Sequence, residues 1–501
     1  MSVSEKKVLA ADLGASSGRV MLCGFDGEKI SIRELHRFSN DPVVLGGTMY
    51  WDFLRLFHEI KQGILKAKQQ GGADSISVDT WGVDFGLLDA EGYLLENPVH
   101  YRDSRTQGML EKSFALMDRE KFYQITGNQF MEINTAFQLL YLSTKRPALL
   151  ERADSLLLMP DLFHYFLCGE KCSEYSIAST TQLLDAKEKV WSSEVLSALG
   201  LPDKLLQPLV QSGTMLSDLR TEITQELGVS SLQVIASAGH DTQCALAAVP
   251  TQEKDFIFIS CGTWSLFGTE LDSPIINEKS ARLNITNEGG VEGRISFLKN
   301  IIGLWLVQES RRQWMREGKE YSFGELESLA GKEEAFRSLI DPDAPEFTPS
   351  GNLPERIRQF CRRTGQPEPL TPGQVVRCIN ESLALKYRLT LEEIRECTGR
   401  DYPVIHMVGG GTQSALLCQF TANACARPVC AGPVEATVYG NAAIQLMAAG
   451  QIGSLTELRK VVAASEPIRR FEPENAAKWE EMYEEYKEKV KQWEKLEVAG
   501  K

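Results

Sequence analysis

An aspartate in a short polar segment is the first candidate for catalytic chemistry. Asp241 belongs to the run Ser237-Ala-Gly-His-Asp-Thr-Gln243, which follows a strand-like stretch and precedes a helix expected over Cys244–Val249. Acids at the carboxyl ends of strands lie where α/β folds bind ligands, and such a carboxylate can accept a proton. Asp is also a preferred helix N-cap residue, so a structural role fits the same position. Both interpretations of Asp241 are open from the residues alone.

A turn of small residues near the N-terminus is suited to binding phosphate. The segment Asp12-Leu-Gly-Ala-Ser-Ser-Gly-Arg19 lies between two strand-like runs. Its backbone N–H groups can approach an anion closely, and the hydroxyls add donors. Asp12 ends the first of these runs and is placed to hold a hydrated Mg²⁺ beside phosphates. An ordinary hairpin turn is the alternative, and the absence of G-x-x-x-x-G-K-[ST] excludes a P-loop NTPase.

The same strand–turn–strand pattern returns halfway along the chain. Phe256-Ile-Phe-Ile-Ser-Cys-Gly-Thr-Trp-Ser-Leu-Phe-Gly268 resembles the first hairpin, with its tip at Ser260–Ser265. Two such hairpins predict two similar domains, 1–243 and 244–501. A third turn, Val408-Gly-Gly-Gly-Thr-Gln-Ser414, joins a strand to a helix. Its glycines suit a flat ligand part lying against backbone, although a glycine run alone is weak evidence.

Aromatic and charged residues gather in two further segments of the first half. Asp79-Thr-Trp-Gly-Val-Asp84 and Tyr101-Arg-Asp-Ser-Arg105 combine a flat apolar face with charged hydrogen-bonding groups. This combination is typical of a pocket for a polyol. A structural tryptophan and a surface ion pair are the alternatives.

Strand-like runs alternate with helical ones, which predicts an α/β architecture. Strands are expected over Val8–Asp12, Arg19–Gly24, Ser75–Asp79, Gly86–Leu88, Gln233–Ala238, Phe256–Cys261, Ser265–Gly268 and Val404–Val408. Helices are expected over Phe53–Gln70, Gln374–Cys397 and from Glu474 onward. The last of these carries aromatic and apolar residues at helical spacing from Trp479 to Trp493, which we interpret as core contact.

Composition narrows the class of protein. The 501 residues carry a formal charge of −14, which argues against nucleic acid or an anionic membrane as the main partner. No run approaches the roughly 20 apolar residues of a spanning helix. The eleven cysteines include no C-x-x-C pair, so we expect a reduced, cytoplasmic protein; whether Cys361 and Cys378 pair is open.

Together these motifs resemble the FGGY carbohydrate kinases of the actin-like ATPase superfamily. The segments on which the resemblance rests are Asp12–Arg19, Val78–Phe85, Tyr101–Thr106, Leu158–Asp161, Gly239–Thr242, Ser260–Ser265, Asn284–Gly290, Lys299–Gln308, Met407–Ser414, Ala431–Ala436 and Gly440–Ala443. The resemblance spans roughly residues 8–450. It implies two actin-like (ribonuclease H-like) domains facing each other across a cleft.

The resemblance also implies an activity. It is that of an ATP- and Mg²⁺-dependent kinase that phosphorylates the 1-hydroxyl of L-rhamnulose in L-rhamnose catabolism. The alternatives are a kinase for L-fuculose or L-xylulose, and an actin- or chaperone-like ATPase. The partner implied is a small ketose, with no nucleic acid and no membrane, for a monomer or a homodimer.

Residue by residue, the resemblance makes Asp241 the catalytic base and Asp12, acting through water, the acid near the metal. Sugar-binding positions are Gly82, His240, Asp241, Thr242 and Asn300; ATP-binding positions are Ala15, Ser16, Ser17, Gly18, Arg19, Thr263, Gln308 and Gly410. Phosphoryl transfer needs positioning and charge neutralisation more than covalent catalysis. The two phosphate turns contain no Lys, so metal dependence is expected.

Overall fold

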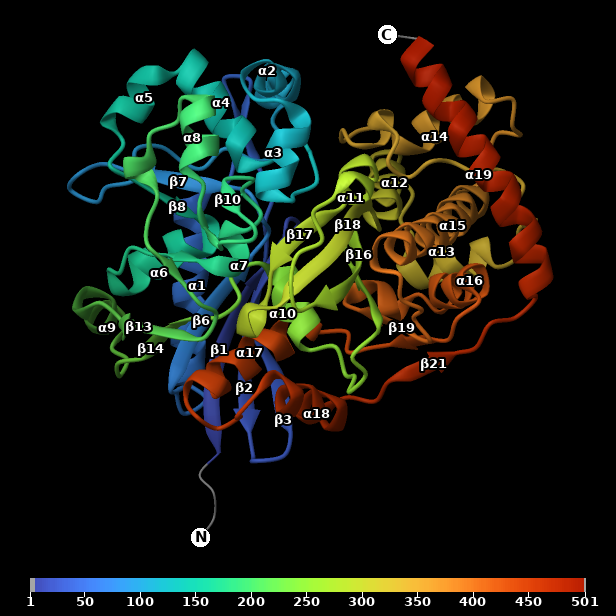
Figure 1. The fold of residues 1–501 in the computed structure, drawn as a ribbon. Coiled ribbons are helices and arrows are strands. Elements are labelled where there is room, and N and C mark those ends of the chain that lie inside the picture. The colour runs from blue at the N-terminus through green and yellow to red at the C-terminus, as the bar shows by residue number, and fades with distance from the viewer. Residues whose placement is uncertain (1–4, 500–501) are drawn as a thin grey trace. The chain divides into compact units, whose positions relative to one another are not determined.

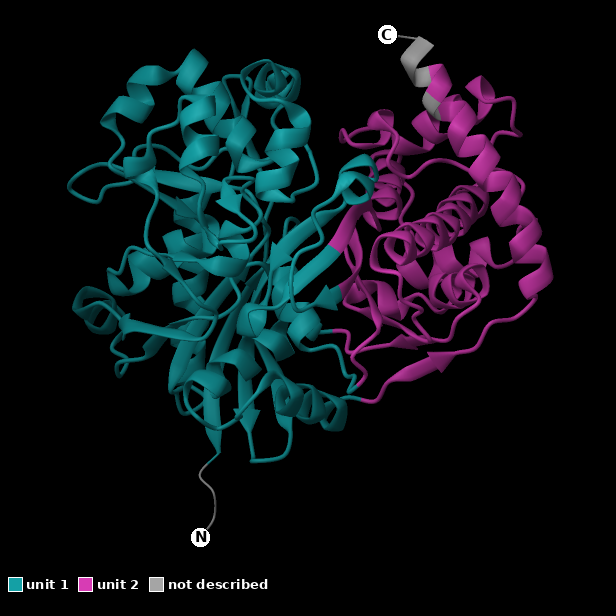
Figure 2. Ribbon diagram, viewed as in Figure 1, with its two compact units in different colours: residues 1–252, 270–297, 435–466 teal, residues 253–269, 298–434, 467–501 magenta. Residues whose placement is uncertain are grey.

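Two mixed β-sheets organise the chain, and the computed structural model describes residues 5–499. The chain divides into two compact units that interleave along the sequence (Figures 1 and 2). Unit 1 comprises Met1–Gln252, Glu270–Phe297 and Glu435–Glu466; unit 2 comprises Glu253–Thr269, Leu298–Val434 and Pro467–Lys501. The division at residues 243 and 244 expected from the sequence stays a prediction.

The sheet of unit 1 brings three acids to one edge. Its order is β13 (Thr214–Asp218), β14 (Gln233–Ala236), β6 (Ser75–Thr80), β1 (Lys6–Leu13), β2 (Ser17–Phe25) and β3 (Ile30–Ser39). β1 runs parallel to β6, with Asp12 opposite Asp79, and antiparallel to β2, with Asp12 opposite Arg19. β14 is also parallel to β6 and leads to Asp241. Because parallel strands end at the same edge, Asp12, Asp79 and Asp241 share it.

The second sheet repeats this pattern. Its order is β17 (Thr286–Gly289), β18 (Ile295–Ile302), β16 (Trp264–Leu271), β15 (Ile257–Cys261), β19 (Ile405–Val408), β20 (Val429–Ala431) and β21 (Arg469–Phe471). β15 is antiparallel to β16 and parallel to β19, as β1 is to β2 and β6. The internal similarity expected from the two hairpins is therefore confirmed. Unit 1 contains β17 and the outer ends of β16 and β18.

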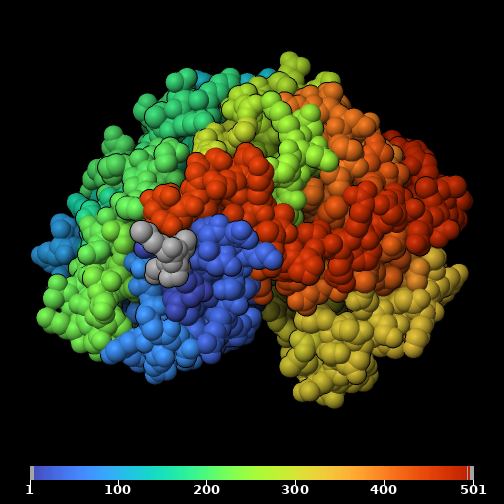
Figure 3. Space-filling view, turned by 90° about the horizontal axis from the view of Figure 1, so that it is seen from below, coloured from blue at the N-terminus to red at the C-terminus, as the bar shows by residue number. Residues whose placement is uncertain are grey.

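Some helices of unit 1 pack on its sheet, and the others pack with short strands in a separate cluster. The helices are α1 (Phe53–Lys68), α2 (Met109–Leu116), α3 (Arg119–Thr126), α4 (Thr135–Lys145), α5 (Pro147–Arg152), α6 (Met159–Cys168), α7 (Tyr175–Ala178), α8 (Ser193–Leu199), α9 (Thr221–Leu227), α10 (Asp241–Ala247), α11 (Glu278–Arg282), α17 (Ala436–Ala448) and α18 (Leu455–Ser465). The short strands are β4 (Val43–Leu45), β5 (Thr48–Tyr50), β7 (Phe85–Leu88), β8 (Ser155–Leu158), β9 (Ser173–Glu174), β10 (Leu184–Asp185), β11 (Val190–Trp191) and β12 (Leu209–Val210). α17 packs on β1, β3 and β6 although it comes late in the chain, and Figure 3 shows this late segment (orange-red) beside the first strands (blue).

Unit 2 surrounds its strands with α12 (Trp305–Arg316), α13 (Phe323–Ala330), α14 (Leu353–Arg363), α15 (Pro372–Thr398), α16 (Ala415–Cys425) and α19 (Ala476–Ala499). α15 begins with a capping box between Thr371 and Gln374 and ends at Gly399, whose φ of 65° suits glycine. Along α19 the side chains of Trp479, Tyr483, Tyr486 and Trp493 are buried, so the core-contact interpretation of this stripe is confirmed.

The strands and helices expected from the sequence are present, with ends that differ by a few residues. All eleven cysteines are free thiols, Cys361 and Cys378 included. Within residues 5–499, no helix combines the length and the apolar composition needed to cross a membrane.

Candidate active site

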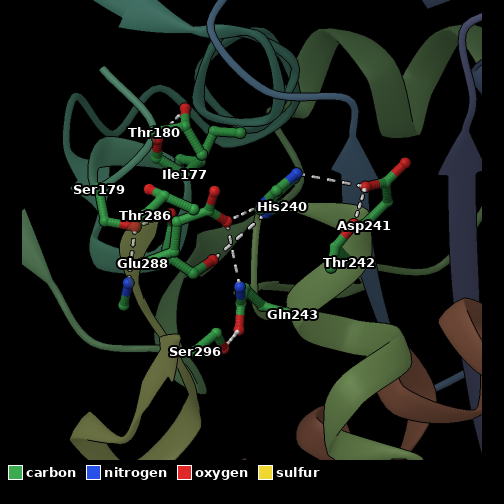
Figure 4. Close-up of polar contacts among 12 residues, drawn as sticks. Ile177, Ser179, Thr180, His240, Asp241, Thr242, Gln243, Thr286, Glu288 and Ser296 are labelled. Carbon is green, nitrogen blue, oxygen red and sulfur yellow. Dashed lines mark hydrogen bonds and ion pairs between the residues drawn. The ribbon is translucent and has the colours of Figure 1, made fainter. Parts of the chain in front are cut away.

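Asp241 is the first residue of α10, and its carboxylate does not cap the helix. The N-cap residue is His240, and no side chain makes a cap hydrogen bond there. Asp241 Oδ1 lies 3.3 Å from the Thr242 hydroxyl and 3.5 Å from Nε2 of His240 (Figure 4). The N-cap interpretation is wrong because the helix starts one residue too early for it. The side chain keeps 30% of its surface exposed and so stays open to a ligand.

His240 lies between Asp241 and a second acid, Glu288 of β17. Its Nδ1 forms an ion pair with Glu288 Oε2 at 3.2 Å, without the alignment of a hydrogen bond. Gln243 donates to the same oxygen over 3.3 Å, and its own carbonyl oxygen accepts from the Ser296 hydroxyl at 2.6 Å. His240, Glu288 and Gln243 are all buried. Glu288 is therefore held facing His240 (Figure 4).

This environment sets the protonation of both groups. Burial raises the pKa of Asp241 to about 6, with Asp12 adding to the effect and His240 opposing it. Burial alone would lower the pKa of His240, but Glu288, together with Asp241 and Glu174, raises it above its ordinary value. A carboxylate that titrates near neutral pH is suited to accept a proton from a hydroxyl.

A strained segment follows β6 and leads away from this site. Thr80 forms an isolated bridge with His240, and Gly82 comes two residues later. A Cβ on Gly82 would lie 3.3 Å from Thr180, so the glycine allows close approach. Val83 has a φ of 68°, which a β-branched residue rarely adopts. It is held by Thr180, which accepts from its N–H, and by Thr135, which donates to its carbonyl oxygen.

Buried Asp84 organises the aromatic residues beside this segment. It accepts hydrogen bonds from the indoles of Trp51 (2.7 Å) and Trp81 (3.0 Å) and from Gln138 (2.9 Å). The Trp51 and Trp81 rings lie 3.9 Å apart. Arg105 donates to Gln138 over 2.6 Å. The polar residues of the proposed polyol pocket thus hold its aromatic wall, and the pocket itself stays a prediction.

The cation of the first phosphate turn is already paired. Arg19 donates to Asp12 Oδ2 through Nε (3.0 Å) and Nη2 (2.8 Å), and its Nη1 lies 2.5 Å from Glu435. Burial tends to lower the pKa of Arg19, but the two carboxylates raise it on balance. Two carboxylates therefore surround the one positive charge at this turn, which leaves no excess of positive charge there.

The turn is also supported by a residue that no sequence pattern indicated. Asn40 is buried; it donates through its side chain to the Gly14 carbonyl (2.8 Å) and through its backbone to the Ser16 carbonyl (3.1 Å). Gly14 N–H closes the turn onto the Ser17 carbonyl at 3.0 Å. With these carbonyls occupied inside the protein, the residues between Gly14 and Arg19 can present N–H and hydroxyl groups to an anion.

Asp79 lies opposite Asp12 on the neighbouring strand β6 and is fully buried. Its Oδ2 accepts from Asn441 of α17 at 2.6 Å, and Asn441 in turn accepts from Gln445 at 2.7 Å. Its Oδ1 is buried without a hydrogen-bond partner. Burial, reinforced by Asp12, raises the pKa of Asp79 well above its usual range.

The acids at this edge fit one kind of metal site. Among residues 5–499, no group of three or more His, Cys, Asp and Glu side chains could hold a metal ion. Mg²⁺ commonly binds one or two carboxylates together with waters and substrate phosphates. The two side-chain contacts of Asp12 use only Oδ2, so Asp12 fits such a site, whereas the carboxyl group of Asp79 is fully buried behind it.

In unit 2, two of the ATP-binding positions named by the resemblance meet. The Thr263 hydroxyl donates to Gln308 Oε1 over 3.3 Å. The Thr263 carbonyl accepts from the backbone of Gly303 (3.2 Å) and Trp305 (3.1 Å), so the turn between β15 and β16 rests on the start of α12. A Cβ on Gly303 would lie 2.5 Å from the Ser265 hydroxyl oxygen, which explains the glycine. Asn300 belongs to β18 nearby in sequence.

The three glycines after β19 have different surroundings. Gly409 has a φ of 85°, and a Cβ there would lie 3.1 Å from the Cys261 carbonyl oxygen. A Cβ on Gly411 would overlap the Cys261 side chain. Gly410 has open space on its Cβ side, so it alone is free to accept a ligand surface.

The structure thus places Asp12, Ala15–Arg19, Gly82, His240, Asp241 and Thr242 in unit 1, and Thr263, Asn300, Gln308 and Gly410 in unit 2. Sequence reasoning missed Glu288, Glu435, Asn441 and Asn40. Glu288 and Glu435 lie inside segments that carry the resemblance, but nothing in their spacing showed which side chains reach the site. The same holds for Asn441 in the segment Gly440–Ala443, whereas Asn40 lies outside every segment that carries the resemblance.

Comparison with known proteins agrees with this arrangement. A model of the FGGY family of carbohydrate kinases, N-terminal domain, matches residues 7–248, and the C-terminal domain model matches residues 257–449. A rhamnulokinase from Bacteroides thetaiotaomicron is 42% identical over 97% of this chain and 100% of its own length. Another from Halalkalibacterium halodurans is 40% identical over 92% and 98%.

Solved structures agree in fold. A ligand-bound xylulose kinase from Lactobacillus acidophilus is 17% identical, with a TM-score of 0.80 over 96% of this chain and 97% of its own. A glycerol kinase from Plasmodium falciparum with ADP is 14% identical, with a TM-score of 0.75 over 97% and 98%. The expected α/β fold with two actin-like domains is confirmed. The chain belongs to the FGGY family of carbohydrate kinases.

Proposed function

We propose that this protein transfers the γ-phosphoryl group of ATP to the 1-hydroxyl of L-rhamnulose, giving L-rhamnulose 1-phosphate and ADP. The relatives that are about 40% identical over nearly the whole chain are named for this activity. The observation in the structure that best supports it is the Asp241 carboxylate. This group is partly exposed, lies 3.5 Å from His240 and has a pKa raised to about 6.

In this proposal Asp241 accepts the proton of the sugar hydroxyl as that hydroxyl attacks phosphorus. His240, Thr242, Gly82 and Asn300 bind the sugar. The close packing of Gly82 against Thr180 and the aromatic residues held by Asp84 fix the shape of this segment, which supports a close-fitting sugar pocket. Proton acceptance by such a base is worth about 10²–10⁴-fold in rate.

ATP is proposed to bind through Ala15, Ser16, Ser17, Gly18, Arg19, Thr263, Gln308 and Gly410. Arg19 is already neutralised by Asp12 and Glu435, so it adds little net positive charge. Mg²⁺ held near Asp12 through water would neutralise phosphate charge when bound. Backbone and hydroxyl donors of the turns would orient the phosphate oxygens.

The test is a panel of ketoses with ATP and Mg²⁺ in a coupled ADP assay. We expect the highest kcat/KM with L-rhamnulose and little ATP turnover without sugar. A higher kcat/KM with L-fuculose or L-xylulose would reassign the substrate. Sugar-independent turnover as fast as the sugar-stimulated rate would favour an actin- or chaperone-like ATPase. A monomeric or dimeric state and a cytoplasmic location stay predictions.

A further inference from the structure

Glu174 is a fully buried carboxylate behind the segment that carries Asp241. It ends β9, and its side chain also accepts from Ile177 N–H at the start of α7 over 3.1 Å. The sequence analysis gave it no role. Neither the phosphate turns nor the sugar-binding positions include it.

Its two oxygens receive four hydrogen bonds. Oε2 accepts from the Gly239 N–H at 2.9 Å, from the Ser176 hydroxyl at 2.5 Å and from Ile177. Oε1 accepts from the Ser212 hydroxyl at 2.6 Å. The Ser176 oxygen also accepts from the His240 N–H at 3.3 Å. One carboxylate oxygen therefore reaches two consecutive backbone N–H groups, one directly and one through Ser176.

The other side of the same peptide is fixed as well. The Gly239 carbonyl accepts from the Thr80 N–H at 2.9 Å at the end of β6. A Cβ on Gly239 would lie 2.9 Å from Pro160 and 3.2 Å from Glu174 Oε2, so only glycine permits this approach. The residue pair that precedes Asp241 is thus held between β6 and Glu174.

The charge on Glu174 is balanced by dipoles. Its four donors are all uncharged N–H and O–H groups. Asp161 is buried beside it and accepts from the Glu174 N–H at 3.1 Å. Burial, with the charge of Glu174 adding to it, raises the pKa of Asp161 well above its usual range, which favours the neutral form of Asp161. A buried carboxylate with several donors forms stronger hydrogen bonds than a neutral acceptor does.

We propose that Glu174 is a positioning residue for catalysis: it fixes Gly239 and His240 so that Asp241 points at the sugar hydroxyl. This inference rests on the proposed role of Asp241. A displacement of about 1 Å in a reacting group can lower the rate about 10²-fold. Loss of Glu174 is therefore expected to act on kcat through Asp241.

The test uses Glu174→Ala, Glu174→Gln, Ser176→Ala and Ser212→Ala in the full chain. We expect Glu174→Ala to lower kcat about 10²-fold with the KM for ATP nearly unchanged. Glu174→Gln should restore most of this activity, because its carbonyl oxygen can replace Oε2 while its amide donates to Ser212. Ser176→Ala should lower kcat by a smaller factor, since it removes the contact to His240. Ser212→Ala is the matched control, because Ser212 contacts the oxygen that does not reach the loop.

A double-mutant cycle separates positioning from general stability. In an Asp241→Asn background, Glu174→Ala should lower kcat by less than about threefold, because the base it positions is gone. Equal factors in both backgrounds would overturn the inference. If Glu174→Ala does not fold, Ser176→Ala takes its place in the cycle, and wild-type kcat in that variant would also overturn it. Failure of the proposed function is distinguishable, because the wild-type protein would then not phosphorylate a ketose.

Discussion

The two sheets share one strand pattern, but the residues at their turns differ in kind. The turn between β1 and β2 has Asp12, Arg19 and Glu435 around it, with Asp79 buried on the neighbouring strand β6. The turn between β15 and β16 is held by uncharged contacts, from Thr263 to Gln308 and to the backbone of Gly303. Of these two turns, the one in unit 1 therefore carries the carboxylates that can bind a metal. The turn in unit 2 offers backbone shape and neutral donors, which suit a nucleoside.

The strongest test of this division is Asp241→Asn. We expect kcat to fall by about 10² or more, because Asn cannot accept the proton. The fold should be kept, since the side chain makes no cap hydrogen bond. The pKa of Asp241 is raised to about 6, so above that pH the ionised carboxylate lowers the stability of the folded protein relative to the unfolded chain. Removing the charge should therefore not lower the melting temperature at pH 7.5.

Steady-state kinetics and thermal melting of the purified variant check both halves of this prediction. The KM for ATP is the internal control, because the proposed ATP positions are other residues. A folded variant that keeps more than about a tenth of the wild-type kcat would contradict the assignment of Asp241 as the base.

A matched glycine pair tests unit 2. Gly411→Ala should lower the free energy of unfolding by about 1–3 kcal/mol, because the new methyl group overlaps the buried Cys261 side chain. Gly410→Ala meets open space and should leave stability unchanged while raising the KM for ATP. Denaturant unfolding and ATP titrations measure the two effects. Lower stability in Gly410→Ala together with a higher KM for ATP in Gly411→Ala would contradict this assignment of the two glycines.

These glycines also show what the sequence can and cannot predict. A strand followed by Gly-Gly-Gly indicated a turn near a ligand, and the turn is present. Which glycine meets protein and which meets open space depends on Cys261, a residue on a neighbouring strand. Likewise, Asp79 and Asn441 are 362 positions apart, and only the packing of α17 on the first sheet joins them. Local patterns predict strands, helices and turns. Contacts between residues far apart in the sequence can be identified only from the folded structure.

Within unit 1, Glu288→Gln tests whether the charge of Glu288 changes the pKa of Asp241 through His240. The ion pair with Glu288 raises the pKa of His240, and the charge on His240 opposes the rise in the pKa of Asp241. Without Glu288, His240 loses its proton more readily, so the pKa of Asp241 rises. The acidic limb of the kcat/KM profile should then move to higher pH. The value of kcat/KM should fall roughly threefold to tenfold near pH 6 and should change little at pH 8.5.

Two further acids affect the pKa values of His240 and Asp241. Glu174 raises that of His240 and Asp12 raises that of Asp241, and both acids are unchanged in the variant. Glu292→Gln is the matched control. It removes an acid four residues further along, whose side chain instead accepts from the Leu455 N–H at 2.9 Å. An unshifted limb in Glu288→Gln, or the same shift in the control, would rule out this coupling.

The smallest effect on kcat is expected at Thr263. Thr263→Val keeps the shape of the side chain but removes the hydroxyl that donates to Gln308 over a long 3.3 Å. The backbone contacts of this turn run through its carbonyl and stay in place. If the pair only binds nucleotide, ground state and transition state lose the same interaction, so the KM for ATP should rise about threefold to tenfold with kcat unchanged. Adding Gln308→Ala should then cost less than it does in the wild type, because the two side chains act together. A fall in kcat at saturating ATP would instead show that the second turn contributes to phosphoryl transfer itself, and the contrast between the two units would be weaker than their charges indicate.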